Sequence, residues 1–144
     1  MLANSRPRPR LRALSLAAVA ASTCLSACGA SDSDRIKDAV RGYIQAVLDD
    51  NGKTACDLLT ADAARVFVDK VKAQTRTSDC ATAFKQEAAT LKDDEKAIYR
   101  SAVLSGVTVN GDTATVTVKF TGVNKDIRLK KQNGDWKIDT GPSG

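Results

Sequence analysis

The chain of 144 residues contains no histidine, and aromatic residues make up only 4% of it. Without histidine, the protein cannot use Ser-His-Asp or Cys-His nucleophilic catalysis. It also cannot bind zinc or haem through an imidazole ligand. The composition therefore excludes whole classes of hydrolase and metalloenzyme.

The chain also lacks an uninterrupted apolar segment of about 20 residues, the length that a membrane-spanning helix needs. Its first apolar segment, ALSLAAVAA at residues 13–21, follows a stretch with four arginines and no acid. A positive segment followed by a short apolar one is typical of a secretory signal peptide. No two of these arginines are adjacent, so a twin-arginine signal is not indicated. We expect residues 1–27 to be an export signal.

Cys28 ends this segment, and the three residues before it are Leu25, Ser26 and Ala27. This sequence resembles the lipobox of bacterial lipoproteins, whose cysteine receives a diacylglycerol group and becomes the first residue of the mature chain. Cys24 is a poorer candidate because no large aliphatic residue lies just before it. Two acyl chains hold a protein stably on a membrane. We therefore expect Cys28 to carry a lipid on the extracytoplasmic face of the cell membrane; an ordinary secretory signal is the alternative.

Small polar residues follow Cys28, so residues 28–33 are expected to be the lipidated cysteine and a short tether before a domain at 34–140. The formal net charge of +5 is largely a property of the export signal, because all 17 acids follow Cys28. The remaining basic cluster, RLKK at residues 128–131, alternates with apolar residues and is interpreted as the solvated face of a strand. A nucleic-acid partner is therefore not expected.

After removal of the signal and acylation of Cys28, two thiols remain, at Cys56 and Cys80. An even pair in an exported protein favours a disulfide. A buried free pair and a redox couple are the alternatives, although the wide spacing differs from a Cys-x-x-Cys motif. Two thiols are too few for an all-cysteine metal site, so neither a metal nor a cofactor is expected.

The first half of the domain has the apolar spacing of helices, and the second half has the alternation of strands. Ser33, Thr60 and Ser78 are expected to cap three helices, and KDDEK at residues 92–96 is expected to be a solvated connection. The inward positions of the strands are expected to be Val103, Ser105, Val107, Val109, Ala114, Val116, Val118, Phe120, Ile127, Leu129, Trp136 and Ile138. The pattern predicts an α+β domain, with helices packed on a curved antiparallel sheet of about four strands.

Three stretches carry a resemblance to a known family: YIQAVLDDNGKTACDLLT, VTVNGDTATVTVKF and LKKQNGDWKID. They resemble the nuclear transport factor 2-like lipoproteins of actinobacteria, over about residues 33–139. The resemblance implies a cone-shaped α+β domain in which helices close over a curved sheet. That fold contains ketosteroid-isomerase-like enzymes, dehydratases and non-catalytic binding modules, so the function must be argued from the site.

Two functions follow from these patterns: a binding module for a small hydrophobic ligand or an envelope protein, and an isomerase-like or dehydratase-like enzyme. An enzyme would need a carboxylate base inside the cone, and Asp57 and Glu87 are the nearest acids to the apolar stripes. Both are expected to face water, which favours a non-catalytic module. The residues expected to line the cone are Tyr43, Phe67, Phe84, Val118, Phe120 and Trp136, and Tyr99 is a further possible inward residue.

Overall fold

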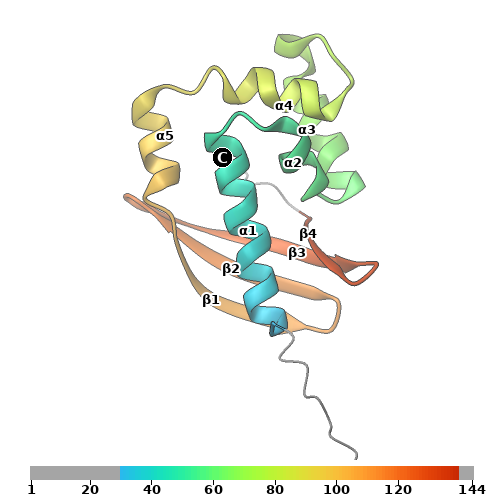
Figure 1. Ribbon diagram of the computed structural model, residues 1–144, viewed down its shortest axis with the longest axis vertical. Coiled ribbons are helices and arrows are strands. Elements are labelled where there is room, and N and C mark those ends of the chain that lie inside the picture. The colour runs from blue at the N-terminus through green and yellow to red at the C-terminus, as the bar shows by residue number, and fades with distance from the viewer. Residues whose placement is uncertain (1–29, 140–144) are drawn as a thin grey trace, which may run out of the picture.

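The computed structural model describes residues 30–139, so the export signal and Cys28 lie outside the described residues. The elements, in chain order, are α1 (Asp32–Leu48), α2 (Gly52–Asp57), α3 (Ala61–Thr75), α4 (Cys80–Ala88), α5 (Asp93–Arg100), β1 (Val103–Asn110), β2 (Thr113–Phe120), β3 (Val123–Gln132) and β4 (Asp135–Ile138). The helices precede the strands and lie mainly on one side of them (Figure 1). The predicted α+β fold, with helices on an antiparallel sheet, is confirmed.

The four strands form one antiparallel sheet in the order β1-β2-β3-β4. Tight turns join successive strands, and each of the three turns contains a glycine with positive φ: Gly111, Gly122 and Gly134. One face of the sheet is buried, and its inward residues alternate with exposed ones as predicted. These buried residues are Ala114, Val116, Val118, Ile127, Leu129, Trp136 and Ile138.

The predicted alternation is wrong in the first half of β1, where a β-bulge changes its phase. Ser105 pairs with Thr117 and Val107 pairs with Val116, so Gly106 has no opposite partner and adopts φ +62°. The extra residue puts Leu104 on the inner face and leaves Val103 59% exposed. A strict period of two cannot describe a strand that contains such a residue.

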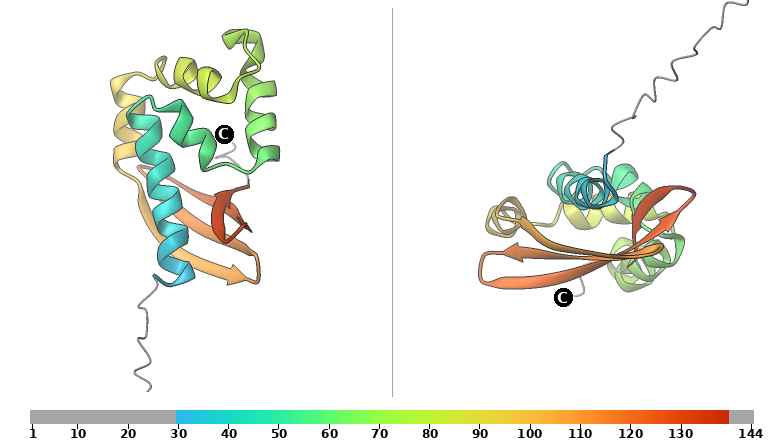
Figure 2. Two further views of the ribbon diagram at one scale, coloured as in Figure 1. Left: turned by 45° about the vertical axis from the view of Figure 1, so that its right-hand side comes forward. Right: turned by 90° about the horizontal axis from the view of Figure 1, so that it is seen from below.

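α1 covers the inner face of the sheet and lies across the strands (Figure 2). Its apolar stripe is fully buried at Ile36 and Val40. The helix begins two residues earlier than expected, because Ser31 is its cap: the Ser31 hydroxyl accepts a hydrogen bond from the backbone N–H of Asp34 at 3.2 Å. Ser33, the predicted cap, lies within the first turn.

The other helices begin where a side chain accepts a hydrogen bond from an unpaired backbone N–H group of the first turn. Thr60 caps α3 as predicted, but α4 is capped by Asp79 in place of Ser78. The acidic run expected to be a connection forms α5, because Glu95 accepts a hydrogen bond from the backbone N–H of Lys92 at 2.9 Å. Acids in a first turn also interact favourably with the helix dipole.

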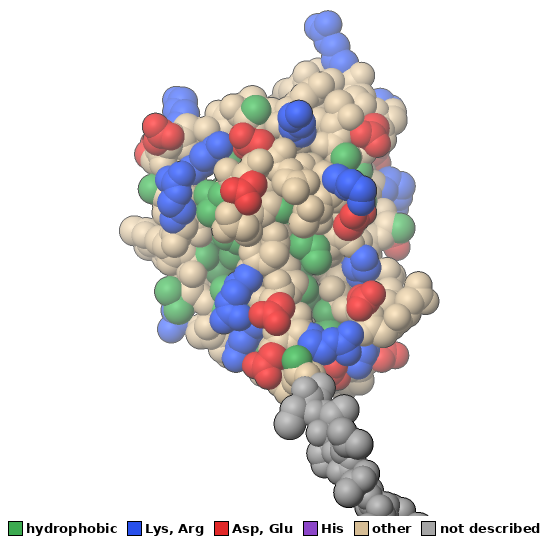
Figure 3. All heavy atoms as spheres, in the orientation of Figure 1, with side chains coloured by type: hydrophobic (Ala, Val, Ile, Leu, Met, Phe, Trp, Pro, Cys, Tyr) green, Lys and Arg blue, Asp and Glu red, His purple; other side chains and the backbone are tan. Residues whose placement is uncertain are grey.

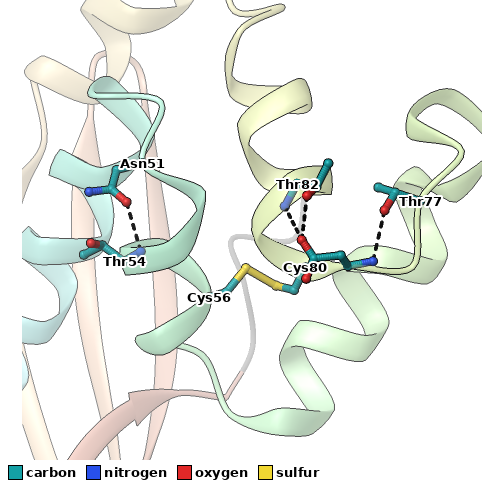
Figure 4. Close-up of a disulfide and its surroundings, with 7 residues drawn as sticks. Asn51, Thr54, Cys56, Thr77, Cys80 and Thr82 are labelled. Carbon is teal, nitrogen blue, oxygen red and sulfur yellow. Dashed lines mark hydrogen bonds between the residues drawn. A yellow bond between two sulfur atoms is a disulfide. The ribbon is translucent and has the colours of Figure 1, made fainter.

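α2 and α4 are joined by a disulfide between Cys56 and Cys80, whose Cα atoms are 6.1 Å apart (Figure 4). The two helices also approach closely at Gly52. A Cβ atom at this position would lie 1.9 Å from the carbonyl oxygen of Ala81. Because that oxygen belongs to the backbone of α4, only glycine permits the observed contact.

Replacing both cysteines by alanine should lower the free energy of unfolding by about 3.5 kcal/mol, since the disulfide closes a loop of about 25 residues in the unfolded chain. Urea unfolding of the Cys56→Ala/Cys80→Ala protein measures this loss. Reduction of the wild-type protein should give the same result. Thiol labelling of the denatured, unreduced protein should leave both cysteines unmodified, and two labelled thiols would contradict the disulfide.

Candidate functional site

Three of the six predicted cone residues form an aromatic cluster in the interior. The ring of Phe84 contacts Tyr43 edge-on at a centroid distance of 5.7 Å and Phe67 at 5.3 Å. Tyr43 lies on α1, Phe67 on α3 and Phe84 on α4, so the cluster joins three helices. Only 7% of Tyr43 and 4% of Phe84 is exposed. These rings fill the space between the helices, and they act as core residues.

Trp136 lies away from this cluster, at the start of α1, and is 3% exposed. Its indole Nε1–H donates a hydrogen bond to Asp32 Oδ1 at 3.1 Å. Lys131 Nζ lies 3.1 Å from both carboxylate oxygens of Asp32 and 5.5 Å from the centroid of the Trp136 ring. These contacts attach the first turn of α1 to β3 and β4. Val118, in the middle of β2, is fully buried.

Phe120, the sixth predicted residue, lies at the partly exposed end of the core beside α5. Its ring meets Tyr99 edge-on at a centroid distance of 6.0 Å, and both side chains are half-buried. Phe120 pairs with Val123 on β3, which is 46% exposed. We call Tyr99, Phe120 and Val123 the α5 rim. Apolar side chains reach the surface between α1 and α5 in the space-filling view (Figure 3).

Burial raises the pKa of two tyrosine hydroxyls, that of Tyr99 in the α5 rim and that of the nearby Tyr43. Burial raises the pKa of Tyr43 above its usual range, and the nearby Tyr99 raises it further. Burial also raises the pKa of Tyr99, with a smaller contribution from the Glu95 carboxylate. A neutral phenol can donate a hydrogen bond to a ligand. The sequence pattern indicated Tyr99 only as a possible inward residue, and it did not indicate Val123, which lies outside the short strand predicted there.

The two carboxylates considered as catalytic bases lie outside the interior. The side chain of Asp57 is 63% exposed and forms an ion pair with Lys53 at 2.7 Å. This contact lowers the pKa of Asp57, so the carboxylate is a weaker base than usual. Glu87 is half-buried on α4. Among the described residues, Thr60 is the only buried polar residue besides the aromatic Tyr43 and Trp136, and its hydroxyl donates a hydrogen bond to Asp139 at 3.1 Å.

Two surface hollows flank the disulfide, and neither is lined by any of the six predicted cone residues. One, of about 280 Å³, lies between α3 and α4 and includes Cys80 in its wall. The other, of about 850 Å³, lies between the α1–α2 turn and α4 and has a mixed polar lining.

Within residues 30–139 there is no cluster of three acids or cysteines that could bind a metal ion. No helix in this part of the chain is long and apolar enough to span a membrane.

Comparison with known proteins agrees with the arrangement of helices and sheet. A family profile described as "Putative lumazine-binding" matches residues 31–140. The chain belongs to this family. The lumazine-binding family has the nuclear transport factor 2-like fold, and its description makes the domain a ligand-binding module. The match covers every element from α1 to β4, including the α5 rim.

A solved structure of Rv3472, a protein of unknown function from Mycobacterium tuberculosis, is also similar to this lumazine-binding family member. Its sequence is 19% identical, the alignment covers 79% of this chain and 74% of that one, and the TM-score is 0.41. No curated protein matches the chain.

The Asp32 contacts predict a specific pH dependence of stability. The hydrogen bond from Trp136 and the hydrogen bond and charge of Lys131 lower the pKa of Asp32 in the folded protein. The ionised carboxylate therefore stabilises the fold above the unfolded pKa of about 3.9, and this contribution is lost as the pH falls through the lower folded pKa. Urea unfolding measured from about pH 6 to about pH 2.5 should show a steeper fall in stability for wild type than for Asp32→Asn.

Asp112→Asn is the matched control for this measurement, because Asp112 is exposed in the β1–β2 turn and its side chain forms no hydrogen bond or ion pair with the described residues. This variant should keep the wild-type slope below about pH 4. Parallel curves for wild type and Asp32→Asn would show that Asp32 does not link stability to pH.

Proposed function

We propose that the mature protein is a lipid-anchored extracytoplasmic module that binds a small ligand without chemical turnover. The absence of a carboxylate from the interior of residues 30–139 carries this proposal. Isomerase-like catalysis needs a base held where burial can raise its pKa. Asp57 is exposed, and its ion pair with Lys53 lowers its pKa.

The α5 rim is the proposed ligand site, because its aromatic edge is the part of the apolar core that remains accessible. Tyr99 and Phe120 present half-buried rings, and Val123 adds exposed aliphatic surface. The Tyr99 hydroxyl supplies a polar group of the kind that usually orients a ligand in an apolar site. The family description names lumazine, a flat heteroaromatic compound with hydrogen-bonding edges. We therefore propose a flat heteroaromatic ligand of this class.

Titration of the protein with lumazine, followed by calorimetry or ligand fluorescence, tests the site. Phe120→Ala and Tyr99→Ala should each weaken binding by about tenfold, since each removes an aromatic contact of roughly 1.5 kcal/mol. Tyr99→Phe keeps the ring and removes the hydroxyl, so it measures the hydrogen bond alone. Val66→Ala on α3, an exposed position outside the rim, should bind as wild type does.

Equal affinity of wild type and both alanine variants would contradict the α5 rim as the ligand site. The absence of catalysis has a separate test. A screened turnover activity that disappears in folded Asp57→Asn or Glu87→Gln protein would show that the domain is an enzyme. These substitutions remove the charge and keep the shape of the side chain.

The proposed anchor rests on the sequence around Cys28, and the fold is compatible with it. Asp32, the first residue of α1, follows Cys28 by four positions, so the tether can span at most about 14 Å. A lipid on Cys28 would therefore hold the domain close to the bilayer. The α1 end near this tether is fixed to the sheet by Asp32.

Mass spectrometry of the membrane-extracted protein should show a chain that begins at Cys28 with a diacylglyceryl group. Cys28→Ala should abolish this modification and release or misprocess the protein, because the thiol is the acceptor of the lipid. Cys24→Ala is the control and should leave anchoring unchanged. A mature chain cleaved elsewhere without lipid would contradict the proposed anchor.

A further inference from the structure

The outer face of the sheet differs in chemistry from the face that packs on α1. No helix covers β1, β2 and β3 on this side in the described part of the chain (Figure 2). Apart from the exposed Val103, which lies opposite Lys119, its side chains are hydroxyls, amides and charged groups, and none is aromatic. They are Thr108 and Asn110 on β1, Thr113, Thr115, Thr117 and Lys119 on β2, and Asn124, Asp126, Arg128 and Lys130 on β3.

Hydrogen-bond donors on this face remain without partners among residues 30–139. In the strand register Thr108 lies opposite Thr115, and Thr115 lies opposite Arg128. None of these three side chains makes a hydrogen bond or ion pair with the described residues. Lys130 lies two residues further along β3 on the same face and is also unpaired. On β1, β2 and β3 the face therefore presents a row of two hydroxyls and a guanidinium, with an ammonium beside it.

The charge of the outer face is predominantly positive. Lys119, Arg128 and Lys130 are exposed cations on β2 and β3, whereas Asp126 is the one carboxylate on the same face of these two strands. Asp139, which follows β4, lies opposite Arg128 and accepts a hydrogen bond from Thr60. Thr117 donates a hydrogen bond to Asp126 at 2.7 Å, which partly satisfies this acid. Lys137 on β4 lies opposite Lys130, although its ammonium donates to the backbone carbonyl of Asp57. Like charges opposite each other destabilise a sheet, so a bound anion would relieve the repulsion between these lysines.

We propose that the outer sheet face binds an extended polyol-phosphate polymer, that is, a chain of phosphodiesters without bases. Phosphodiester oxygens accept hydrogen bonds and carry negative charge, which matches a face of unpaired donors and cations. Arg128 can bind two oxygens of one phosphate, and Thr115 lies beside it to donate a further hydrogen bond. Lys130 supplies a point charge for the next phosphate.

The spacing of the cations suits such a polymer. Residues two apart on one face of a strand are separated by about 6.6 Å, and an extended glycerol phosphate chain repeats its charge at a comparable distance. A single-stranded nucleic acid fits less well, because the face has no aromatic side chain on which bases can stack. An acidic peptide also fits less well, because extended peptides are usually bound through backbone hydrogen bonds at a sheet edge.

Binding of poly(glycerol phosphate) to the full-length protein in detergent, measured by calorimetry at several salt concentrations, tests the proposal. Wild type should bind, with affinity that falls as salt rises, because phosphate contacts release counterions. Arg128→Gln/Lys130→Gln should weaken binding at low salt by at least about tenfold. Asp126→Asn should strengthen it, since it removes the opposing charge.

The matched control is Lys70→Gln/Lys72→Gln, which makes the same change in net charge at two exposed positions on α3. It should reduce affinity by less than about twofold. Circular dichroism and urea unfolding of every variant establish that each one is folded. Lumazine binding should be unchanged in all of them, because the α5 rim lies on the other side of the sheet.

Four outcomes would overturn the proposal. The first is no binding of the polymer to wild type at low salt. The second is equal weakening by the β3 pair and by the α3 control pair, which would indicate general charge attraction. The third is binding of poly-glutamate or of oligo(dT), through the same residues, at least as tight as that of the polymer. The fourth is that the protein binds anionic vesicles through Arg128 and Lys130 but does not bind the soluble polymer.

Discussion

The packing of α1 on the inner face of the sheet is the contact on which the rest of the structure depends. A four-stranded sheet with one apolar face needs a cover, and α1 supplies it with Ile36 and Val40 against residues such as Ile127 and Ile138. Each such side chain contributes roughly 1.5–3 kcal/mol by its burial. The contacts of Asp32 with Trp136 and Lys131 then fix the first turn of the helix on β3 and β4.

The remaining helices pack around this pair of layers, and their packing closes the cone. Gly52 lets α2 approach the backbone of α4, and the disulfide joins the same two helices. Phe84 is thereby held between Tyr43 and Phe67, so aromatic rings occupy the space that a larger ligand would need. This is why the proposed site lies at the α5 rim, where the core ends in half-buried rings.

The sequence predicted the fold well because its signals were local. The Asn-Gly turns and the alternation of β2 depend on neighbouring residues, and these predictions agree with the structure. One error arose at Gly106, where an extra residue changes the phase of the strand. The other arose at an acidic run, where a contact between Lys92 and Glu95 starts α5. The six residues expected to line the cone lie in the apolar core or pack against it, and only Phe120 lies at the proposed site. Whether aromatic side chains fill a cone or line it depends on how closely the helices approach, and no local pattern reports that distance.

Strand geometry allows this small domain to present two surfaces of different chemistry. Leu129 and Lys130 are neighbours in sequence but lie on opposite faces, so the core and the polar surface are encoded by alternate residues of one strand. Lys130 is also about 23 Å along β3 from Val123 at the α5 rim, at a rise of about 3.3 Å per residue. A ligand at the rim and a polymer on the outer face would therefore touch neither each other nor a shared side chain.

Coupling between two sites requires an element whose conformation both ligands change, and a sheet held by α1 along its inner face offers little freedom for such a change. The two proposed binding events should thus be thermodynamically independent, and the domain could hold both partners at once.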